Sequence, residues 1–383
     1  MKTPDYIRVK PVFLFPSLAR GAYWQPVFAE FVKMFPQTVV VTGLWEGFLD
    51  RYKDAFRVEV VGRTRFVKIP LLKPHGHYPS GFVQTPIIGL IRTLPKIRPD
   101  VLFVSGFSFW SFLGALYKTL FRACLIVVYD GSSPSVDRQS SRIHRLWRRF
   151  LSRWADAFVT NTQAGRRYLM EFLGVPENQV FVHPYQVPAP DLWQNQNGRP
   201  SLDRVTFIYV GQLIPQKGLS YLISAVRILK EMELRKYWEL WLVGDGSLRS
   251  NLESQVKDLG LQNRVRFLGK VKYDELGALL SMADVFVFPT LEDVWGVAPL
   301  EAMAMGKPVV CSKYAGASEI IEDGVEGFVV DPMNVKEVAN RMLCFIENPS
   351  LIQEMGRNSK EKMQKFTPKH AAKFLSDVIL RCL

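Results

Sequence analysis

The chain has 383 residues, of which 48% are hydrophobic and 22% charged, and these shares exclude a largely disordered protein. Because ordinary domains hold roughly 100 to 200 residues, we expect two of them. The formal net charge is +13. Residues 1–195 carry 25 Lys and Arg against 13 Asp and Glu, a net charge of +12, which leaves +1 for residues 196–383. The excess of basic residues therefore lies in the N-terminal half of the chain.

Short apolar runs separated by helical stretches recur along the first half of the chain. The runs expected to form strands are 12–15, 38–43, 101–105, 124–130, 157–161 and 180–184. Apolar strands that alternate with helices are typical of a parallel sheet covered on both faces. The uncharged segment 101–117 falls short of the roughly 20 residues that span a membrane, and we interpret it as a strand, a turn and a helix. We predict an α/β domain over residues 1–190 and no transmembrane span.

A basic amphipathic helix is predicted at residues 138–154, which hold six arginines and no acidic residue. At helical spacing, the apolar residues form one side and the arginines crowd the remainder. The simplest interpretation is that the apolar side packs on the core and the cationic face is solvated. The alternative is an acceptor surface or an anionic membrane contact, since each basic residue near such a surface adds roughly 1 kcal/mol. The residues assigned to that surface are Arg142, Arg145, Trp147, Arg148 and Arg149.

Other partners and compartments are constrained by what the sequence lacks. Without zinc spacing or an RNP-like strand to accompany the charge, nucleic acid ranks last as a partner, and we expect none. The cysteines are widely separated, so neither a disulfide framework nor a metal site is expected. They are Cys124, Cys311, Cys344 and Cys382. The N-terminal residues do not resemble a signal peptide. We expect a cytoplasmic protein, with a peripheral position on the inner face of a membrane as an extension of that prediction.

A second domain follows a segment that resembles a linker, residues 184–204, which hold four prolines and a run of amides. The strands expected after it are 205–211, 238–246, 265–269, 285–290, 308–312 and 327–332. We predict a doubly wound domain over residues 200–367, with the tail helix 368–383 packing back on the first domain. Ligands of open α/β sheets bind beyond the carboxyl ends of strands, so two such domains facing each other would enclose a cleft.

Two glycine-rich loops follow successive strands of the second domain, GQLIPQKG at 211–218 and VGDGSL at 243–248. Glycines permit close backbone approach, and Lys217 places a cation at the start of a helix whose N–H groups favour anions. This combination suits a phosphate or diphosphate. An ordinary loop with an exposed lysine would show the same pattern.

The stretch EDVWGVAPLEAMAMGKPVV, residues 292–310, adds carboxylates to these loops. Asp293 precedes a helix expected from about Ala298, and Glu301 lies about one turn inside that helix. A helix cap would explain Asp293 but not Glu301, whereas carboxylates can accept hydrogen bonds from the vicinal hydroxyls of a sugar. Four backbone N–H groups between the acids are expected to be free to donate. They belong to Val294, Trp295, Gly296 and Val297. The sequence therefore predicts a site for a sugar attached to a phosphate.

Five segments of the second half resemble one known family. GQLIPQKG, LVGDGSL, VRFLGKV, FVFPTLEDVWGVAPLEAMAMGKPVV and GASEIIEDGVEGFVV follow the order and spacing of the C-terminal domain of the family 4 GT-B glycosyltransferases, over roughly residues 205–345. The first 190 residues are similar to the family only in their alternation of strands and helices. The resemblance implies two Rossmann-like domains facing across a cleft. It also implies a retaining enzyme that moves a hexose from a UDP- or GDP-sugar to an acceptor, here a lipid-linked or membrane-surface glycan or glycolipid, without an obligatory cofactor or metal.

The resemblance also implies roles for individual residues. Glu301 would bind the nucleotide ribose, Asp293 the donor sugar, and Lys217 would neutralise the diphosphate leaving group. The backbone near Lys270 and Val271 would receive the base. The donor-binding residues implied are Gly21, Gly211, Gln212, Lys217, Val271, Asp293, Val294, Trp295, Gly296, Val297 and Glu301.

The chain departs from the family pattern at three places. Asp293, with Glu292 beside it, stands where Glu is usual, and Gln212 stands where Arg is usual. The strand that usually delivers a His ends here at Asp130, which we assign to orienting the acceptor hydroxyl or binding the donor sugar. The catalytic residues expected are therefore Lys217, Asp293 and Asp130. Two alternatives remain: a catalytically silent, nucleotide-sugar-binding subunit of a glycan-assembly complex, and a phosphorylase or epimerase on the same architecture.

Overall fold

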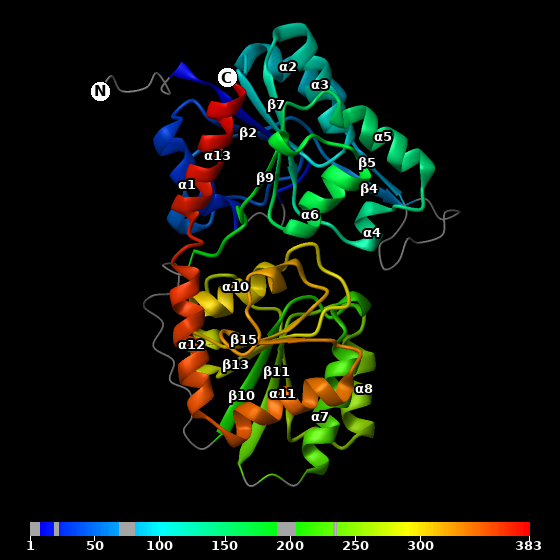
Figure 1. Ribbon diagram of the computed structural model, residues 1–383, viewed down its shortest axis with the longest axis vertical. Helices are drawn as coiled ribbons and strands as arrows, with labels where there is room; N and C mark the ends of the chain where they lie inside the picture. The colour runs from blue at the N-terminus through cyan, green and yellow to red at the C-terminus, as the bar shows by residue number, and fades with distance from the viewer. Residues whose placement is uncertain (1–7, 19–22, 69–80, 190–203, 233, 235) are drawn as a thin grey trace. The chain divides into compact units, whose positions relative to one another are not determined.

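The computed structural model describes the whole chain except residues 1–7, 19–22, 69–80, 190–203, 233 and 235. The chain divides into two compact units (Figure 1). Unit 1 comprises Met1–Val187 and Pro368–Leu383, and unit 2 comprises Pro188–Thr367. Among the described residues, no helix is both long and apolar enough to cross a membrane.

Unit 1 is built on a parallel sheet in the order β3-β2-β1-β6-β7-β8-β9. Its strands are β1 (Pro11–Phe15), β2 (Val39–Thr42), β3 (Arg57–Val60), β6 (Val101–Ser105), β7 (Cys124–Tyr129), β8 (Ala157–Thr160) and β9 (Val180–Val182). The central strands are almost entirely buried, as their apolar sequences predict. The sequence did not predict the edge strand β3 or the antiparallel hairpin of β4 (Arg65–Lys68) and β5 (Gly81–Gln84).

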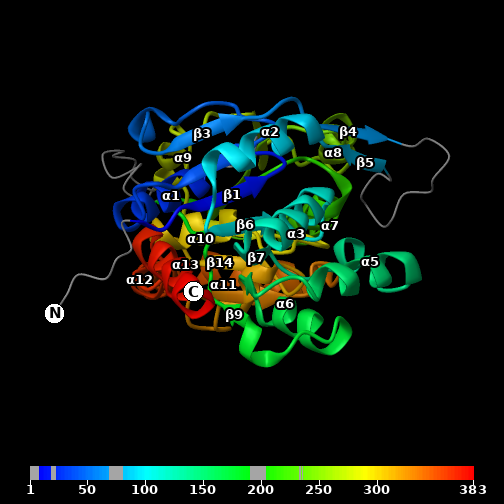
Figure 2. The same ribbon diagram turned by 90° about the horizontal axis from the view of Figure 1, so that it is seen from above.

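Helices cover this sheet, and the last of them comes from the far end of the chain. They are α1 (Trp24–Met34), α2 (Ile87–Ile97), α3 (Phe109–Phe121), α4 (Pro134–Asp137), α5 (Arg142–Ser152), α6 (Gln163–Arg167) and α13 (Pro368–Cys382), with short turns at 50–52, 168–172 and 177–179. Helix α13 packs against α1 (Figure 1). Helices α3 and α5 lie side by side in both views (Figures 1 and 2).

Helix α13 also brings two cysteines together that are far apart in the sequence. Cys124, at the start of β7, and Cys382, at the end of α13, line the same surface cavity. Their thiols interact, and this interaction raises the pKa of Cys124 and lowers that of Cys382. All four cysteines are free thiols.

Unit 2 contains a second parallel sheet, in the order β12-β11-β10-β13-β14-β15. Its strands are β10 (Arg204–Val210), β11 (Tyr237–Val243), β12 (Val265–Gly269), β13 (Val285–Phe288), β14 (Val309–Ser312) and β15 (Gly327–Val330). Its helices are α7 (Leu219–Glu231), α8 (Arg249–Asp258), α9 (Leu276–Met282), α10 (Val297–Ala304), α11 (Val335–Glu347) and α12 (Ser350–Met363), with short turns at 215–217 and 316–319.

The strand order of unit 2 reverses beside its first strand. From β10 the chain adds β11 and β12 on one side, then crosses to β13 on the other. In parallel α/β sheets, the loops on either side of such a switch point diverge and leave a crevice at the carboxyl ends of the strands. The loops that follow β10 and β13 are the two segments that carry Lys217 and Asp293.

Candidate functional site

The loops after β10 and β13 are held together by backbone contacts. The carbonyl of Gln216 accepts the N–H of Leu291 at 2.7 Å and the hydroxyl of Thr290 at 3.0 Å. Gly218 begins α7 with φ +64°, and a Cβ there would lie 2.0 Å from the carbonyl oxygen of Pro289. Only glycine combines that backbone angle with so close an approach, so Gly218 fixes the spacing of the two loops.

Lys217 and Asp293 meet where these loops touch. The ammonium of Lys217 donates to Oδ2 of Asp293 at 2.6 Å, and their side chains are 17% and 19% exposed. The same Nζ lies 5.2 Å from the centroid of the Phe288 ring. Two residues 76 positions apart in sequence thus form one charged pair. Lys217 is not the exposed loop lysine of the simpler interpretation.

The hydrogen bond to the other oxygen of Asp293 contradicts part of the prediction of free backbone donors. Oδ1 accepts the N–H of Trp295 at 3.2 Å, so that N–H is not free, and the indole is a core side chain with 2% exposure. The prediction of four free donors is therefore wrong at Trp295, because the carboxylate closes a tight turn on its own chain. Val294, Gly296 and Val297 are partly exposed. Gly296 precedes α10 with φ +88°, and no side chain of the described residues caps that helix.

Glu301 lies in the second turn of α10 with 6% exposure. Its Oε1 accepts the hydroxyl of Tyr273 at 2.8 Å. Burial raises the pKa of its carboxyl to about 7, and the bond from Tyr273 opposes only part of that shift. The sequence did not identify Tyr273, because its partner is 28 residues away. The neighbouring acid Glu292 is also buried, at 7% exposure.

The glycine loops of unit 2 pack on each other. The hydroxyl of Tyr209 donates to the carbonyl of Gln212 at 2.9 Å, and a Cβ at Gly244 would lie 1.9 Å from the carbonyl oxygen of Gly211. The second loop therefore supports the first. The side chain of Gln212 is exposed, and Val271 is partly buried against the core.

Gly218→Ala is expected to reduce the free energy of unfolding by about 2 kcal/mol or more, because it adds a backbone clash to the cost of a positive φ. The matched control is Gly324→Ala, where φ is +83° and nothing lies within 4 Å of the added Cβ. We expect the control to lose about 1 kcal/mol, the conformational cost alone. Urea unfolding of both variants measures the difference, and equal losses would contradict the close approach to Pro289.

In unit 1, Asp130 follows β7 and is held by residues beyond β9. Its Oδ1 accepts from the amide of Gln186 at 2.8 Å and from the hydroxyl of Tyr185 at 3.1 Å. The amide of Asn161 donates to its backbone carbonyl at 2.9 Å. Burial raises the pKa of the Asp130 carboxyl. Both of these side-chain hydrogen bonds are accepted by Oδ1, so they orient the carboxylate through that oxygen. The predicted phosphate contact at Gly21 lies outside the described residues.

The side of helix α5 that faces the protein is not the one expected. Ile143, Leu146 and Phe150 are 80%, 68% and 43% exposed, whereas the side chain of Arg148 is only 12% exposed. Arg145 stacks over the ring of Phe172, with its guanidinium carbon 4.8 Å from the centroid. The prediction that the apolar side packs on the core and the arginines are solvated is therefore wrong in part. Leu151 is buried, Trp147 is partly buried and Arg142, Arg149 and Arg153 are exposed, as predicted. The exposed apolar residues and the buried Arg148 contradict it.

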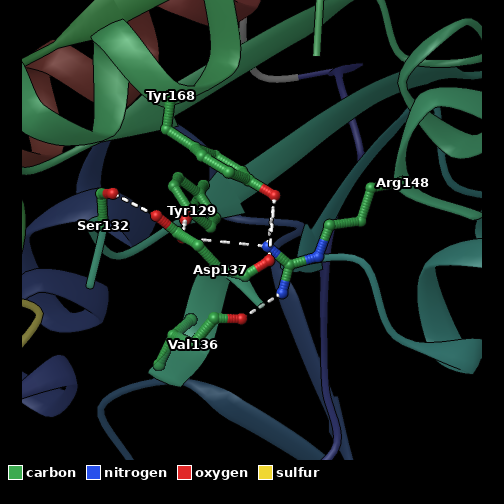
Figure 3. Close-up of polar contacts among 6 residues, drawn as sticks. All are labelled: Tyr129, Ser132, Val136, Asp137, Arg148 and Tyr168. Atoms are coloured by element: carbon green, nitrogen blue, oxygen red, sulfur yellow. Dashed lines mark hydrogen bonds and ion pairs between the residues drawn. The ribbon is translucent and has the colours of Figure 1, made fainter. Parts of the chain in front are cut away.

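A polar socket in unit 1 explains why the side chain of Arg148 is turned toward the protein (Figure 3). Arg148 donates to the hydroxyl of Tyr168 at 2.8 Å and to the carbonyl of Val136 at 2.5 Å, and its Nη1 lies 3.8 Å from Oδ1 of Asp137. Tyr129 and Ser132 donate to the same carboxylate. Because Asp137 is 2% exposed and its pKa is raised by burial, it needs these partners. The cluster comprises Tyr129, Ser132, Val136, Asp137, Arg148 and Tyr168.

The other assigned residues of α5 divide between the two faces. Trp147 is partly buried and donates from Nε1 to the carbonyl of Phe107 at 2.9 Å. Arg142 is exposed. Arg149 is also exposed, and its Nη2 donates to the carbonyl of Phe172 at 2.9 Å.

Arg148→Met is expected to reduce the free energy of unfolding by about 2 kcal/mol, because it leaves Asp137 buried without its cation. Arg142→Met, on the exposed side of the same helix, is the matched control and should change stability by less than about 0.5 kcal/mol. Thermal or urea unfolding compares them. A loss at Arg148 no larger than that at Arg142 would show that the socket does not hold the helix.

Two family models match the chain, one in each unit. The model of the glycosyl transferases group 1 matches residues 193–362, and that of the glycosyl transferase 4-like domain matches residues 21–186. An uncharacterised glycosyltransferase of Methanocaldococcus jannaschii is 34% identical over 191 residues, 47% of this chain and 48% of that protein. The alpha-D-kanosaminyltransferase of Streptomyces kanamyceticus is 30% identical over 157 residues, 41% of this chain and 40% of that protein. The chain thus spans less than half the length of these relatives.

The fold comparison extends over nearly the whole chain. The crystal structure of HepE from Anabaena in complex with UDP has a TM-score of 0.76 and 22% identity, and the match covers 97% of this chain and 100% of that one. The two parallel sheets and this similarity confirm the expected GT-B class, with two Rossmann-like domains.

Proposed function

The chain belongs to the group 1 glycosyltransferases, and from this membership we propose that it is a retaining enzyme that moves a hexose from a nucleotide-sugar to an acceptor hydroxyl. The observation that carries the proposal is the Lys217–Asp293 pair at the β10/β13 switch point. Nucleotides bind at such points in doubly wound sheets. The UDP bound by HepE supports a UDP-linked donor ahead of a GDP-linked one.

In this proposal the two residues of the charged pair bind different parts of the donor. Lys217, together with the start of α7, faces the diphosphate, whose negative charge grows as the bond from the anomeric carbon to the phosphate oxygen breaks. Asp293 accepts from hydroxyls of the sugar. Because Trp295 orients its other oxygen, the carboxylate can present Oδ2 without moving its backbone. Glu301 accepts from the ribose hydroxyls in its ionised form.

The remaining assignments concern the acceptor and the diphosphate. Asp130 orients the acceptor hydroxyl or binds the donor sugar, and its anchoring by Tyr185 and Gln186 supports a positioned carboxylate. Gln212 is neutral and exposed, so Lys217 supplies the cation that the family usually shares between two residues. The acceptor is proposed to be a glycan or glycolipid at a membrane surface, and the enzyme to need no resident cofactor.

A donor screen tests the proposal. Purified protein is incubated with UDP- and GDP-hexoses, and donor binding is followed by thermal stabilisation. Lipid, glycan and small-molecule acceptors are then added, and NMR of the product reports the anomeric configuration. Stabilisation by UDP-hexose and a product that retains the donor configuration are expected. If no donor stabilises the protein and Glu301→Ala changes nothing, the proposal fails. Binding without transfer to any acceptor would favour the silent subunit instead.

A further inference from the structure

Helix α5 exposes a continuous apolar stripe. Ile143, Leu146 and Phe150 follow one another at intervals of three and four residues, which places them on one face of α5, and Trp154 follows in the turn just beyond the end of the helix. Their exposed fractions are 80%, 68%, 43% and 38%. Large apolar side chains gathered on one exposed face mark an interaction surface more often than isolated ones do.

A second exposed stripe lies on the neighbouring helix α3. Phe109, Leu116 and Leu120 are 41%, 47% and 67% exposed and share one face. The rings of Phe112 and Trp147 pack between the two helices, with centroids 5.7 Å apart. Further along both helices, Lys118 donates to the carbonyl of Trp154 at 2.9 Å. The two contacts show that the helices run in the same direction, so the stripes lie alongside each other.

The charges of the segment that carries the α5 stripe are of one sign. Arg142, Arg149 and Arg153 are exposed on α5, adjacent on the helical wheel to the stripe, and residues 138–154 contain no acid. The acidic residues that flank this segment in sequence are already engaged. Asp137 is buried in the socket of Arg148, and Asp156 pairs with Lys118 at 2.6 Å.

We propose that α5 and α3 dock unit 1 on an anionic lipid bilayer, with the apolar stripe inserted at the boundary between headgroups and acyl chains. The exposed arginines of α5 then contact the anionic headgroups, the arrangement typical of interfacial helices. Arg145 and Arg148 take no part, because they hold the helix on unit 1. The proposed surface is therefore the exposed side of α5, and the side that holds Arg148 faces the protein.

The same charges argue against a second copy of the chain as the occupant. A two-fold interface would bring each stripe against its own counterpart and the exposed arginines of one copy close to those of the other. No acid of residues 138–154 is available to compensate that repulsion. An anionic bilayer can bury the apolar stripe and pair with the exposed arginines at the same time.

The test is cosedimentation of the full chain with vesicles. One set holds phosphatidylcholine alone, and the other also holds about 30% phosphatidylglycerol, at roughly 0.1 and 0.5 M NaCl. The stripe variant is Leu146→Ser with Phe150→Ser. The matched control is Ile88→Ser with Ile91→Ser on α2, whose side chains are 68% and 58% exposed. The charge variant is Arg142→Gln with Arg149→Gln.

Wild type should bind the anionic vesicles, and the stripe variant should bind at least about tenfold more weakly, although its charges are intact. The charge variant should also weaken, mainly at low salt, and the α2 control should bind as wild type. The proposal is overturned if the wild type does not bind anionic vesicles, or if the stripe variant binds them as tightly as the wild type. The proposal is also overturned if analytical ultracentrifugation without lipid shows that the wild type is a dimer and the stripe variant a monomer. Thermal stabilisation by UDP-hexose, measured on the same samples, reports separately on the proposed function.

Discussion

Lys217→Met should lower kcat by about 10²–10³-fold, the usual cost of removing one group that stabilises a charge developing in the transition state. Methionine keeps most of the stem but removes the cation, and with it the contact of the ammonium with the Phe288 ring. The effect should fall on kcat more than on KM, because the negative charge on the diphosphate grows as the glycosidic bond breaks. Steady-state rates with the donor found by the screen measure it.

The matched control for that variant is Lys257→Met, which removes an exposed lysine from α8 in the same unit. Its kcat should stay within about twofold of wild type, since exposed charges remote from a site contribute little. Both variants need unchanged unfolding midpoints for the comparison to hold. A Lys217→Met enzyme with wild-type kcat would remove this residue from the mechanism.

The second large effect concerns Glu301 and pH. With its pKa at about 7 in the free protein, the ionised carboxylate that can accept two ribose hydroxyls is a minor form at pH 6 and the major form at pH 8. Affinity for a UDP-hexose, whose diphosphate has no group that titrates between these pH values, should therefore rise roughly tenfold from pH 6 to pH 8. Glu301→Gln should bind about 10–100-fold more weakly at pH 8, and its affinity should not change with pH. Calorimetric titration at both pH values decides this.

Stability should change with pH in the opposite sense. The pKa of Glu301 is raised above its ordinary value of 4.5, so the folded protein holds the proton more tightly than the unfolded chain. That contribution is fully present below pH 4.5 and is lost as pH rises to about 7. Without nucleotide, Glu301→Gln should therefore gain stability relative to wild type at pH 8, by roughly 2–3 kcal/mol, but not at pH 4. Urea unfolding at the two pH values measures the difference, and a constant difference would contradict the raised pKa.

The sequence predicted the parallel strands well because burial on both faces leaves an almost wholly apolar run. It missed β3, with the sequence RVEV, since an edge strand with exposed charges lacks that pattern. The loops that carry Lys217 and Asp293 were predicted separately. Their contact could not be, because it depends on the strand order β10-β13 and on the fit of Gly218 against Pro289.

The orientation of α5 shows why periodicity alone was insufficient. Helical spacing separated its apolar residues from its arginines, but the side that faces the protein takes residues from both, since Leu151 and Arg148 are both turned inward. The inward position of Arg148 is set by the socket of Asp137 and Tyr168, which lie before and after the helix in sequence and meet only in the folded unit. The hydrogen bond from Tyr273 to Glu301 was hidden for the same reason, since it joins residues on separate elements.

The return of α13 to unit 1 has a consequence for how the chain folds as it is made. The 180 residues of unit 2, 188–367, are translated between the body of unit 1 and the helix that covers α1. At about 5–20 residues per second, α1 leaves the ribosome well over 10 s before α13 exists. During that interval α1 lacks the helix that packs on it in the folded unit. The first unit to begin folding is therefore the last to be completed, after unit 2 has had time to form.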